Sequence, residues 1–104
     1  MAKKLSDNQI TSYTNIYKER GENGLYKFVV GNSIVRFASG VKTPETDLLD
    51  LSDSFFSLFR SSGEDIYFEI GKVMRRGAHT IYRKLLKTQN KQVNNKFLNI
   101  IKWQ

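Results

Sequence analysis

The 104-residue sequence contains no cysteine, one proline and one histidine. The absence of cysteine excludes disulfide bonds, thiolate zinc sites and thiol nucleophiles, and one histidine cannot form a two-histidine metal site. The scattered glycines form neither a phosphate-binding loop nor a dinucleotide-binding motif. We therefore expect no metal and no cofactor.

The sequence also lacks a long hydrophobic run. Positive charge at the N-terminus is not followed by the apolar stretch of a signal peptide, and no segment approaches the length of a membrane span. These absences predict a cytoplasmic protein with no membrane partner. Hydrophobic residues make up 39% of the chain, which is enough for a packed core, so we expect a single domain over residues 1–104.

Acidic residues are absent from the last third of the chain. Residues 71–104 carry nine Lys and Arg but no Asp or Glu, whereas residues 1–70 carry eight basic and ten acidic residues. The net charge of +7 therefore arises at one end of the sequence. A block of one sign focuses electrostatic potential and attracts polyanions, so nucleic acid is the first partner to consider.

Two β-prone runs flank the pair Gly31-Asn32, which suits a type II′ turn. This pattern predicts a β-hairpin over residues 25–38. Pairing outward from the turn sets Lys27 opposite Arg36. Like charges in this position are tolerated either because water screens them or because an anion binds there.

Helical patterns predict most of the remaining structure. We expect one helix at 6–20, a second at 44–60 that starts with the only proline, and a third at 65–88. An asparagine-rich connection follows, and the short apolar element at 94–103 fits helix and strand equally well. The expected fold class is α+β, a hairpin packed with three or four helices. Because the 44–60 helix is apolar on more than one side, we also expect a homodimer.

The third predicted helix has two contrasting faces. Its apolar face comprises Ile66, Ile70, Val73, Met74, Gly77, Ala78, Ile81 and Leu85. At about 100° per residue, six basic residues fall within an arc of about 120° on the opposite side and span about 22 Å. We call them the basic face: Lys72, Arg75, Arg76, His79, Arg83 and Lys87.

Two interpretations of the basic face are open. Lys and Arg can simply solvate the outer side of an amphipathic helix. Exposed helix faces, however, commonly mix Glu with Lys at i,i+4 spacing, and no acid follows Glu69 here. The acids between Glu45 and Glu69 are a competing partner within the molecule. We favour binding of an external anion, because exposed ion pairs contribute little.

These observations predict a small basic nucleic-acid-binding protein, a transcriptional regulator or accessory factor that prefers duplex DNA to RNA and is not an enzyme. The basic face supplies phosphate contacts, and Lys27 with Arg36 supplies orientation or base recognition. One alternative is an inhibitor or immunity-type module that docks on an acidic protein. A second is a metal-independent ribonuclease in which His79 acts with Arg75, Arg83 and Tyr82.

The predicted order strand, helix, helix over residues 33–88, with its Ser62-Gly63 turn, resembles the ribbon-helix-helix DNA-binding proteins. The resemblance implies a dimer whose paired strands enter the major groove and present Arg36 to the bases. This chain departs from the family pattern in its second, local hairpin strand. It also departs in the acids at the amino end of the last helix, Glu64 and Asp65.

Overall fold

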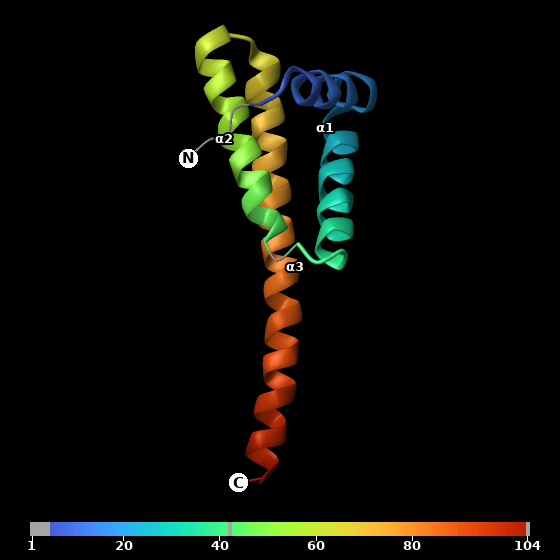
Figure 1. Ribbon diagram of the computed structural model, residues 1–104, viewed down its shortest axis with the longest axis vertical. Coiled ribbons are helices and arrows are strands. Elements are labelled where there is room, and N and C mark those ends of the chain that lie inside the picture. Colours follow the sequence, from blue (N-terminus) through green and yellow to red (C-terminus); the bar gives the residue numbers. More distant parts are fainter. Residues whose placement is uncertain (1–4, 42, 104) are drawn as a thin grey trace.

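The structure of the chain, a computed structural model, describes residues 5–41 and 43–103, and the side chains among them up to residue 87. It contains three helices, α1 (Asp7–Ala38), α2 (Pro44–Ser62) and α3 (Asp65–Trp103), and no strand among the described residues (Figure 1). The predicted α+β class is therefore wrong. The protein is a three-helix bundle.

The hairpin predicted at 25–38 is instead the second half of α1. Leu25, Val29 and Ser33 recur at i, i+4 and i+8, and all three are buried. The polar Ser33 interrupts this apolar repeat in the sequence, and the residues around it have high β-propensity. The sequence therefore indicates a strand more strongly than a helix. β-propensity depends on context, and here burial against α3 decides the structure. Without a strand, the resemblance to ribbon-helix-helix proteins is also wrong.

A kink at Gly21 divides α1 into two segments. Gly21 has φ 75° and ψ −173°, a conformation that is essentially restricted to glycine. The first segment begins at a capping box between Ser6 and Gln9 and lies across one end of the bundle, whereas the second runs alongside α3 (Figure 1). The first segment packs on the core through Tyr13, whose ring meets that of Phe55 edge-on at 6.0 Å.

α2 and α3 form a helical hairpin. α2 begins at Pro44, as its fixed φ favours, and Gly63 ends it in the left-handed conformation with φ 74°. The predicted helix at 65–88, the predicted connection and the predicted element at 94–103 together form the single helix α3. α3 contains no proline, and no glycine follows Gly77 in it. α3 is about 58 Å long, at 1.5 Å per residue over 39 residues, and extends beyond the ends of α1 and α2 (Figure 1).

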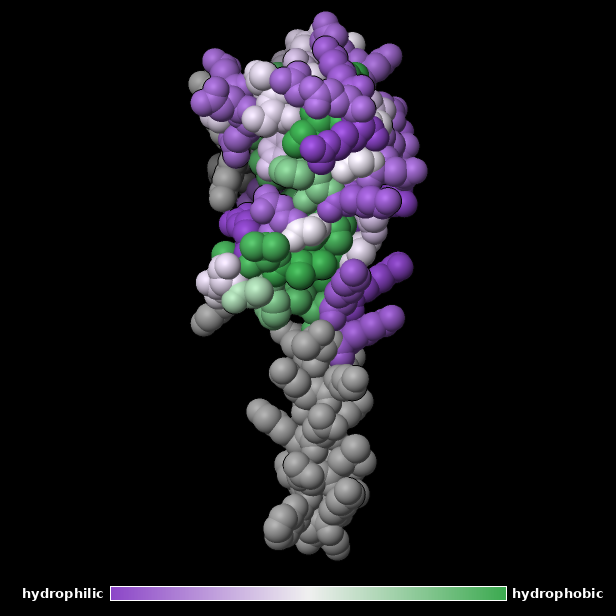
Figure 2. All heavy atoms as spheres, turned by 90° about the vertical axis from the view of Figure 1, so that its right-hand side faces the viewer, coloured by the Kyte–Doolittle hydropathy of each residue, from purple (hydrophilic) through white to green (hydrophobic). Residues whose placement is uncertain are grey.

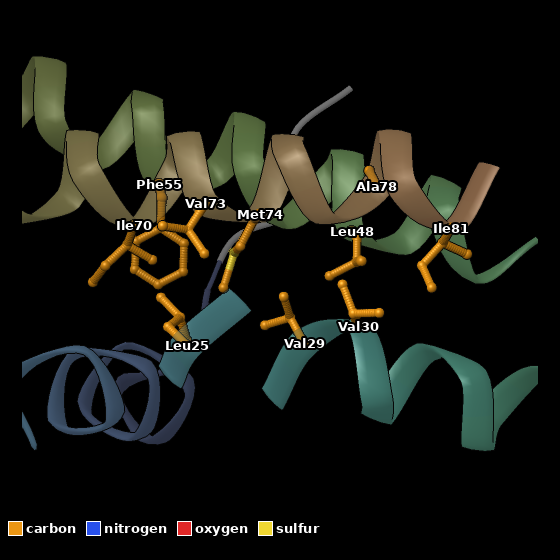
Figure 3. Close-up of a cluster of buried hydrophobic side chains, with 10 residues drawn as sticks. All are labelled: Leu25, Val29, Val30, Leu48, Phe55, Ile70, Val73, Met74, Ala78 and Ile81. Carbon is orange, nitrogen blue, oxygen red and sulfur yellow. The ribbon is translucent and has the colours of Figure 1, made fainter. Parts of the chain in front are cut away.

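All three helices contribute to the buried core, which lies between α3 and the other two (Figure 3). The apolar face predicted for the third helix is confirmed, since its central residues are buried. The core residues are Leu25, Val29, Val30, Leu48, Phe55, Ile70, Val73, Met74, Ala78 and Ile81. Because one side of α3 faces this core, the opposite side of the same helix is left to solvent.

Two glycines of α3 mark close approaches between helices. A Cβ atom on Gly77 would lie 3.1 Å from Val29 Cγ2 of α1, and one on Gly71 would lie 2.7 Å from the Phe56 ring of α2. Ser52 of α2 also donates a buried hydrogen bond of 2.7 Å to the Gly71 carbonyl. The α2–α3 contact is therefore specified by shape and by a polar contact together.

Across residues 5–41 and 43–103, the helices include no stretch with the combined length and hydrophobicity that crossing a bilayer requires.

Candidate nucleic-acid interface on α3

The basic face lies on the solvent side of α3, opposite the buried stripe. All six of its residues are exposed. The helix is continuous through this region, so the spacing assumed from the sequence applies to the folded chain. The side chains thus form one strip of about 22 Å along the helix, a length that matches several successive phosphates of a nucleic-acid strand.

Two members of the basic face are engaged within the molecule. Lys72 Nζ lies 3.2 Å from Glu69 Oε1, one turn earlier on α3. Arg76 Nη1 lies 3.7 Å from Glu22 Oε1 of α1, and its guanidinium lies 4.4 Å from the centroid of the Tyr26 ring. The paired side chains are between 38% and 57% exposed, so solvent screens both ion pairs strongly.

The other four members make no ion pair with any residue in the described part of the chain: Arg75, His79, Arg83 and Lys87. Of the acids between Glu45 and Glu69, the competing partner that the sequence suggested, Glu69 pairs with Lys72, and no other forms an ion pair with the basic face among the described residues. One of them, Asp47, instead binds Arg36 of α1. The strip therefore keeps most of its positive charge available to an external anion.

Lys27 and Arg36 do not face each other, in contrast to the hairpin prediction. They are nine residues apart on α1, which places them on opposite sides of the helix at about 100° per residue. Lys27 is exposed, whereas Arg36 Nη2 lies 2.7 Å from Asp47 Oδ2 and ties the end of α1 to the start of α2. The prediction that both residues recognise bases depended on a β-hairpin that would hold them side by side. Both residues lie on a helix instead, so this prediction has lost its basis.

The structure adds an acidic neighbour to the basic face that the sequence analysis did not assign. Glu45 of α2 lines a pocket of about 240 Å³ with His79 and Tyr82 of α3. Oε2 of Glu45 is buried and has no hydrogen-bond partner among the described residues. Helical spacing had placed His79 and Tyr82 near each other, but nothing in the sequence indicated that Glu45, thirty-four positions earlier, would join them.

A second group of neighbours lies at the start of the basic face. Phe68 precedes Lys72 by one turn, and the Lys72 ammonium lies 5.0 Å from the centroid of its ring. Phe56 and Phe59 of α2 pack against the same ring. The i,i+3 spacing of these two phenylalanines shows that they share a side of α2, but not that this side meets Phe68.

Within residues 5–41 and 43–87, no group of three or more His, Asp or Glu side chains is arranged to hold a metal ion. Comparison with protein families, curated proteins and solved structures found no match.

Proposed function

We propose that the protein binds nucleic acid, with duplex DNA preferred to RNA, through the basic face of α3, and that it acts as a regulator or accessory factor in the cytoplasm. One observation carries the proposal. Four of the six basic residues on one face of a single helix have no ion-pair partner among the described residues. A strip whose positive charge exceeds that of its acidic partners attracts a polyanion, and phosphate contacts supply most of the affinity of such complexes.

The test is duplex binding by fluorescence anisotropy over a series of salt concentrations. The logarithm of the affinity should fall linearly with the logarithm of salt concentration, because bound cations release counterions. Replacing Arg75 and Arg83 together by Ala should flatten this slope by about two units. Both side chains are exposed and unpaired among the described residues, so the fold should be unaffected.

A matched control removes the same net charge elsewhere. Lys18 and Arg20 are exposed on the first segment of α1, and neither belongs to the basic face. The double replacement of Lys18 and Arg20 by Ala should leave the salt slope unchanged. Equal effects of the two double variants would show that net charge, and not this face, governs binding.

Self-association forms part of the proposal, with a second copy of the chain as the partner. Phe56 and Phe59, which gave α2 its apolar breadth, pack on Phe68 within the molecule, so α2 is not the surface we favour. Hydrophobic side chains instead gather on the α1 side of the molecule (Figure 2). Ile34 and Phe37 of α1 line a pocket there with Leu85 of α3. Sedimentation velocity should show a dimer that Phe37→Glu dissociates.

A ribonuclease is the second candidate, supported by the pocket that holds His79, Tyr82 and Glu45. A carboxyl group and an imidazole that line the same pocket can serve as the acid and base of phosphodiester cleavage. This function requires that RNA incubated with the purified protein is cleaved and that His79→Ala abolishes the cleavage. The inhibitor or immunity-type alternative requires saturable binding to an acidic protein at salt concentrations where duplex DNA does not bind.

A further inference from the structure

A pocket lined by aromatic and basic side chains lies between α2 and α3, where the basic face begins. Its volume is about 440 Å³, within the range of small-molecule sites. We call it the aromatic pocket. It combines three phenyl rings with three cations and contains no acid among its lining residues: Phe56, Phe59, Arg60, Phe68, Lys72 and Arg75.

The three rings form a supported stacking surface. The centroid of the Phe68 ring lies 5.6 Å from that of Phe56 and 5.1 Å from that of Phe59, and both contacts are tilted. Phe56 is held against α3 because Gly71 has no Cβ, which would lie 2.7 Å from this ring. Phe68 remains 38% exposed. The supporting rings fix its position and leave part of it open to a ligand.

The position of Lys72 shows how an external group can approach Phe68. The Lys72 ammonium lies 5.0 Å from the centroid of the Phe68 ring, within the distance of a cation–π interaction. The Lys72 side chain is 51% exposed, and its other interaction among the described residues is an exposed ion pair with Glu69. Such contacts are weak, so this ammonium can move from the ring to a phosphate when a flat ligand takes its place.

Two arginines supply the other positive charges of the pocket. Arg60 extends from the last turn of α2, and Arg75 belongs to the basic face of α3. Both are exposed, and neither forms an ion pair with another described residue. The pocket is therefore complementary to a planar aromatic group that carries an anionic group beside it.

We propose that the aromatic pocket binds an unpaired base of a nucleic acid, which stacks on Phe68 while Arg60, Lys72 and Arg75 contact the adjoining phosphate. The proposal rests on the function proposed above, because the pocket opens where the basic face begins. Bases inside a duplex are stacked and cannot reach such a pocket. A strand end, an overhang or an extruded base can do so, and aromatic stacking accepts any of the four bases.

The experiment compares three labelled duplexes by fluorescence anisotropy. The first has blunt ends, the second carries a short single-stranded overhang, and the third carries an overhang of the same length built from abasic nucleotides. The second and third carry equal numbers of phosphates, so a difference in their affinity reports the bases alone. We expect the duplex with the base-bearing overhang to bind about tenfold more tightly than its abasic counterpart.

Variants of the protein test whether this preference for the base-bearing overhang arises in the aromatic pocket. Phe68→Leu keeps an apolar side chain but removes the stacking surface, so it should abolish the tenfold preference and leave the affinity for the blunt duplex unchanged. Phe68→Trp should restore the preference. Tyr82→Leu is the matched control, because Tyr82 is an aromatic residue of α3 that is 53% exposed and lies outside the aromatic pocket. Thermal unfolding followed by circular dichroism verifies that each variant folds.

The outcomes separate this inference from the proposed function. If the blunt duplex binds and the two overhangs bind equally, or if Phe68→Leu keeps the preference, the pocket proposal fails and duplex binding stands. If only the duplex with the base-bearing overhang binds, and Phe68→Leu removes that binding, the pocket proposal stands and the preference for duplex fails. If none of the three duplexes binds, both proposals are wrong.

Discussion

The guanidinium of Arg76 stacks over the ring of Tyr26 at 4.4 Å from its centroid, so one residue of the basic face also joins α3 to α1. The Tyr26 hydroxyl lies 2.6 Å from Thr80 Oγ1, and Arg76 Nη1 lies 3.7 Å from Glu22 Oε1. Arg75, the preceding residue, has no ion pair among the described residues. Two adjacent arginines of the same face therefore differ in what they contribute to the fold.

Replacing each arginine by alanine should separate stability from binding. Arg76→Ala removes the stacking contact and an exposed ion pair, so we expect the free energy of unfolding to fall by about 1 kcal/mol. Arg75→Ala should change it by less than about 0.5 kcal/mol. Urea unfolding followed by circular dichroism measures both. Equal losses would contradict the contact with Tyr26.

Gly31 distinguishes the helix in the structure from the hairpin suggested by the sequence. It lies within α1, and a Cβ atom built on it meets nothing within 4 Å. Gly31→Ala should therefore raise the free energy of unfolding by about 0.5–1 kcal/mol, because alanine favours an exposed helix interior. In a II′ turn the same change would be destabilising, since glycine is required at that position. A lower midpoint of urea unfolding would thus argue against a continuous helix here.

The contrast between α1 and α3 explains what the sequence could predict. The apolar stripe of α3 runs through Ile70, Met74 and Ile81 at a helical period that no polar residue interrupts, and it is buried as expected. In α1 the corresponding period passes through Ser33, while neighbouring valines and aromatics favour a strand. Local preference and tertiary burial disagreed at this point, and a single sequence does not show which neighbour a segment will pack against.

The candidate site also has a part that the sequence could predict and a part that it could not. The six basic residues of the basic face lie on one helix, so helical geometry alone was enough to group them. Asp47, Glu22 and Tyr26 reach their basic partners from other helices, and their contacts depend on packing. The aromatic pocket likewise combines α2 with α3. Sequence spacing therefore grouped the basic residues of α3, but could not identify the residues that contact basic side chains from other helices.

The buried hydroxyl of Ser52 offers a test of the α2–α3 contact. Its Oγ donates a 2.7 Å hydrogen bond to the Gly71 carbonyl, and Ser52 is 1% exposed. Ser52→Ala should lower the free energy of unfolding by about 1 kcal/mol, as expected for the loss of one such bond. Ser61→Ala is the control, because Ser61 is exposed and its Oγ donates a hydrogen bond within its own helix, to the Leu58 carbonyl. We expect it to change stability by less than about 0.5 kcal/mol.

Tyr13 should contribute to the loss of stability at alkaline pH. Burial raises its pKa above the usual 10.0, and the positive charge of Arg36 opposes this effect only in part. The unfolded chain then releases the phenolic proton at a lower pH than the folded chain. The stability due to neutral Tyr13 is therefore complete below pH 10 and is lost as pH rises through the folded-state pKa.

Phenylalanine has no phenolic proton to release, so the replacement Tyr13→Phe isolates the contribution of this titration to stability. Urea midpoints measured from neutral pH to above pH 10 should fall less steeply for the variant than for the wild type. Parallel pH profiles of the two proteins would show that Tyr13 does not titrate differently in the folded and unfolded states.

The position of α3 between α1 and α2 has a consequence for the order of folding. α1 and α2 contact each other less than either contacts α3, and each packs mainly on α3. α2 and α3 are joined by the two residues Gly63 and Glu64, so their contacts are local and form quickly, whereas α1 must close a longer loop to reach α3. We therefore expect the helical hairpin to form first and α1 to dock onto it last. Transient undocking of α1 would then uncover one side of the core while α2 and α3 stay packed.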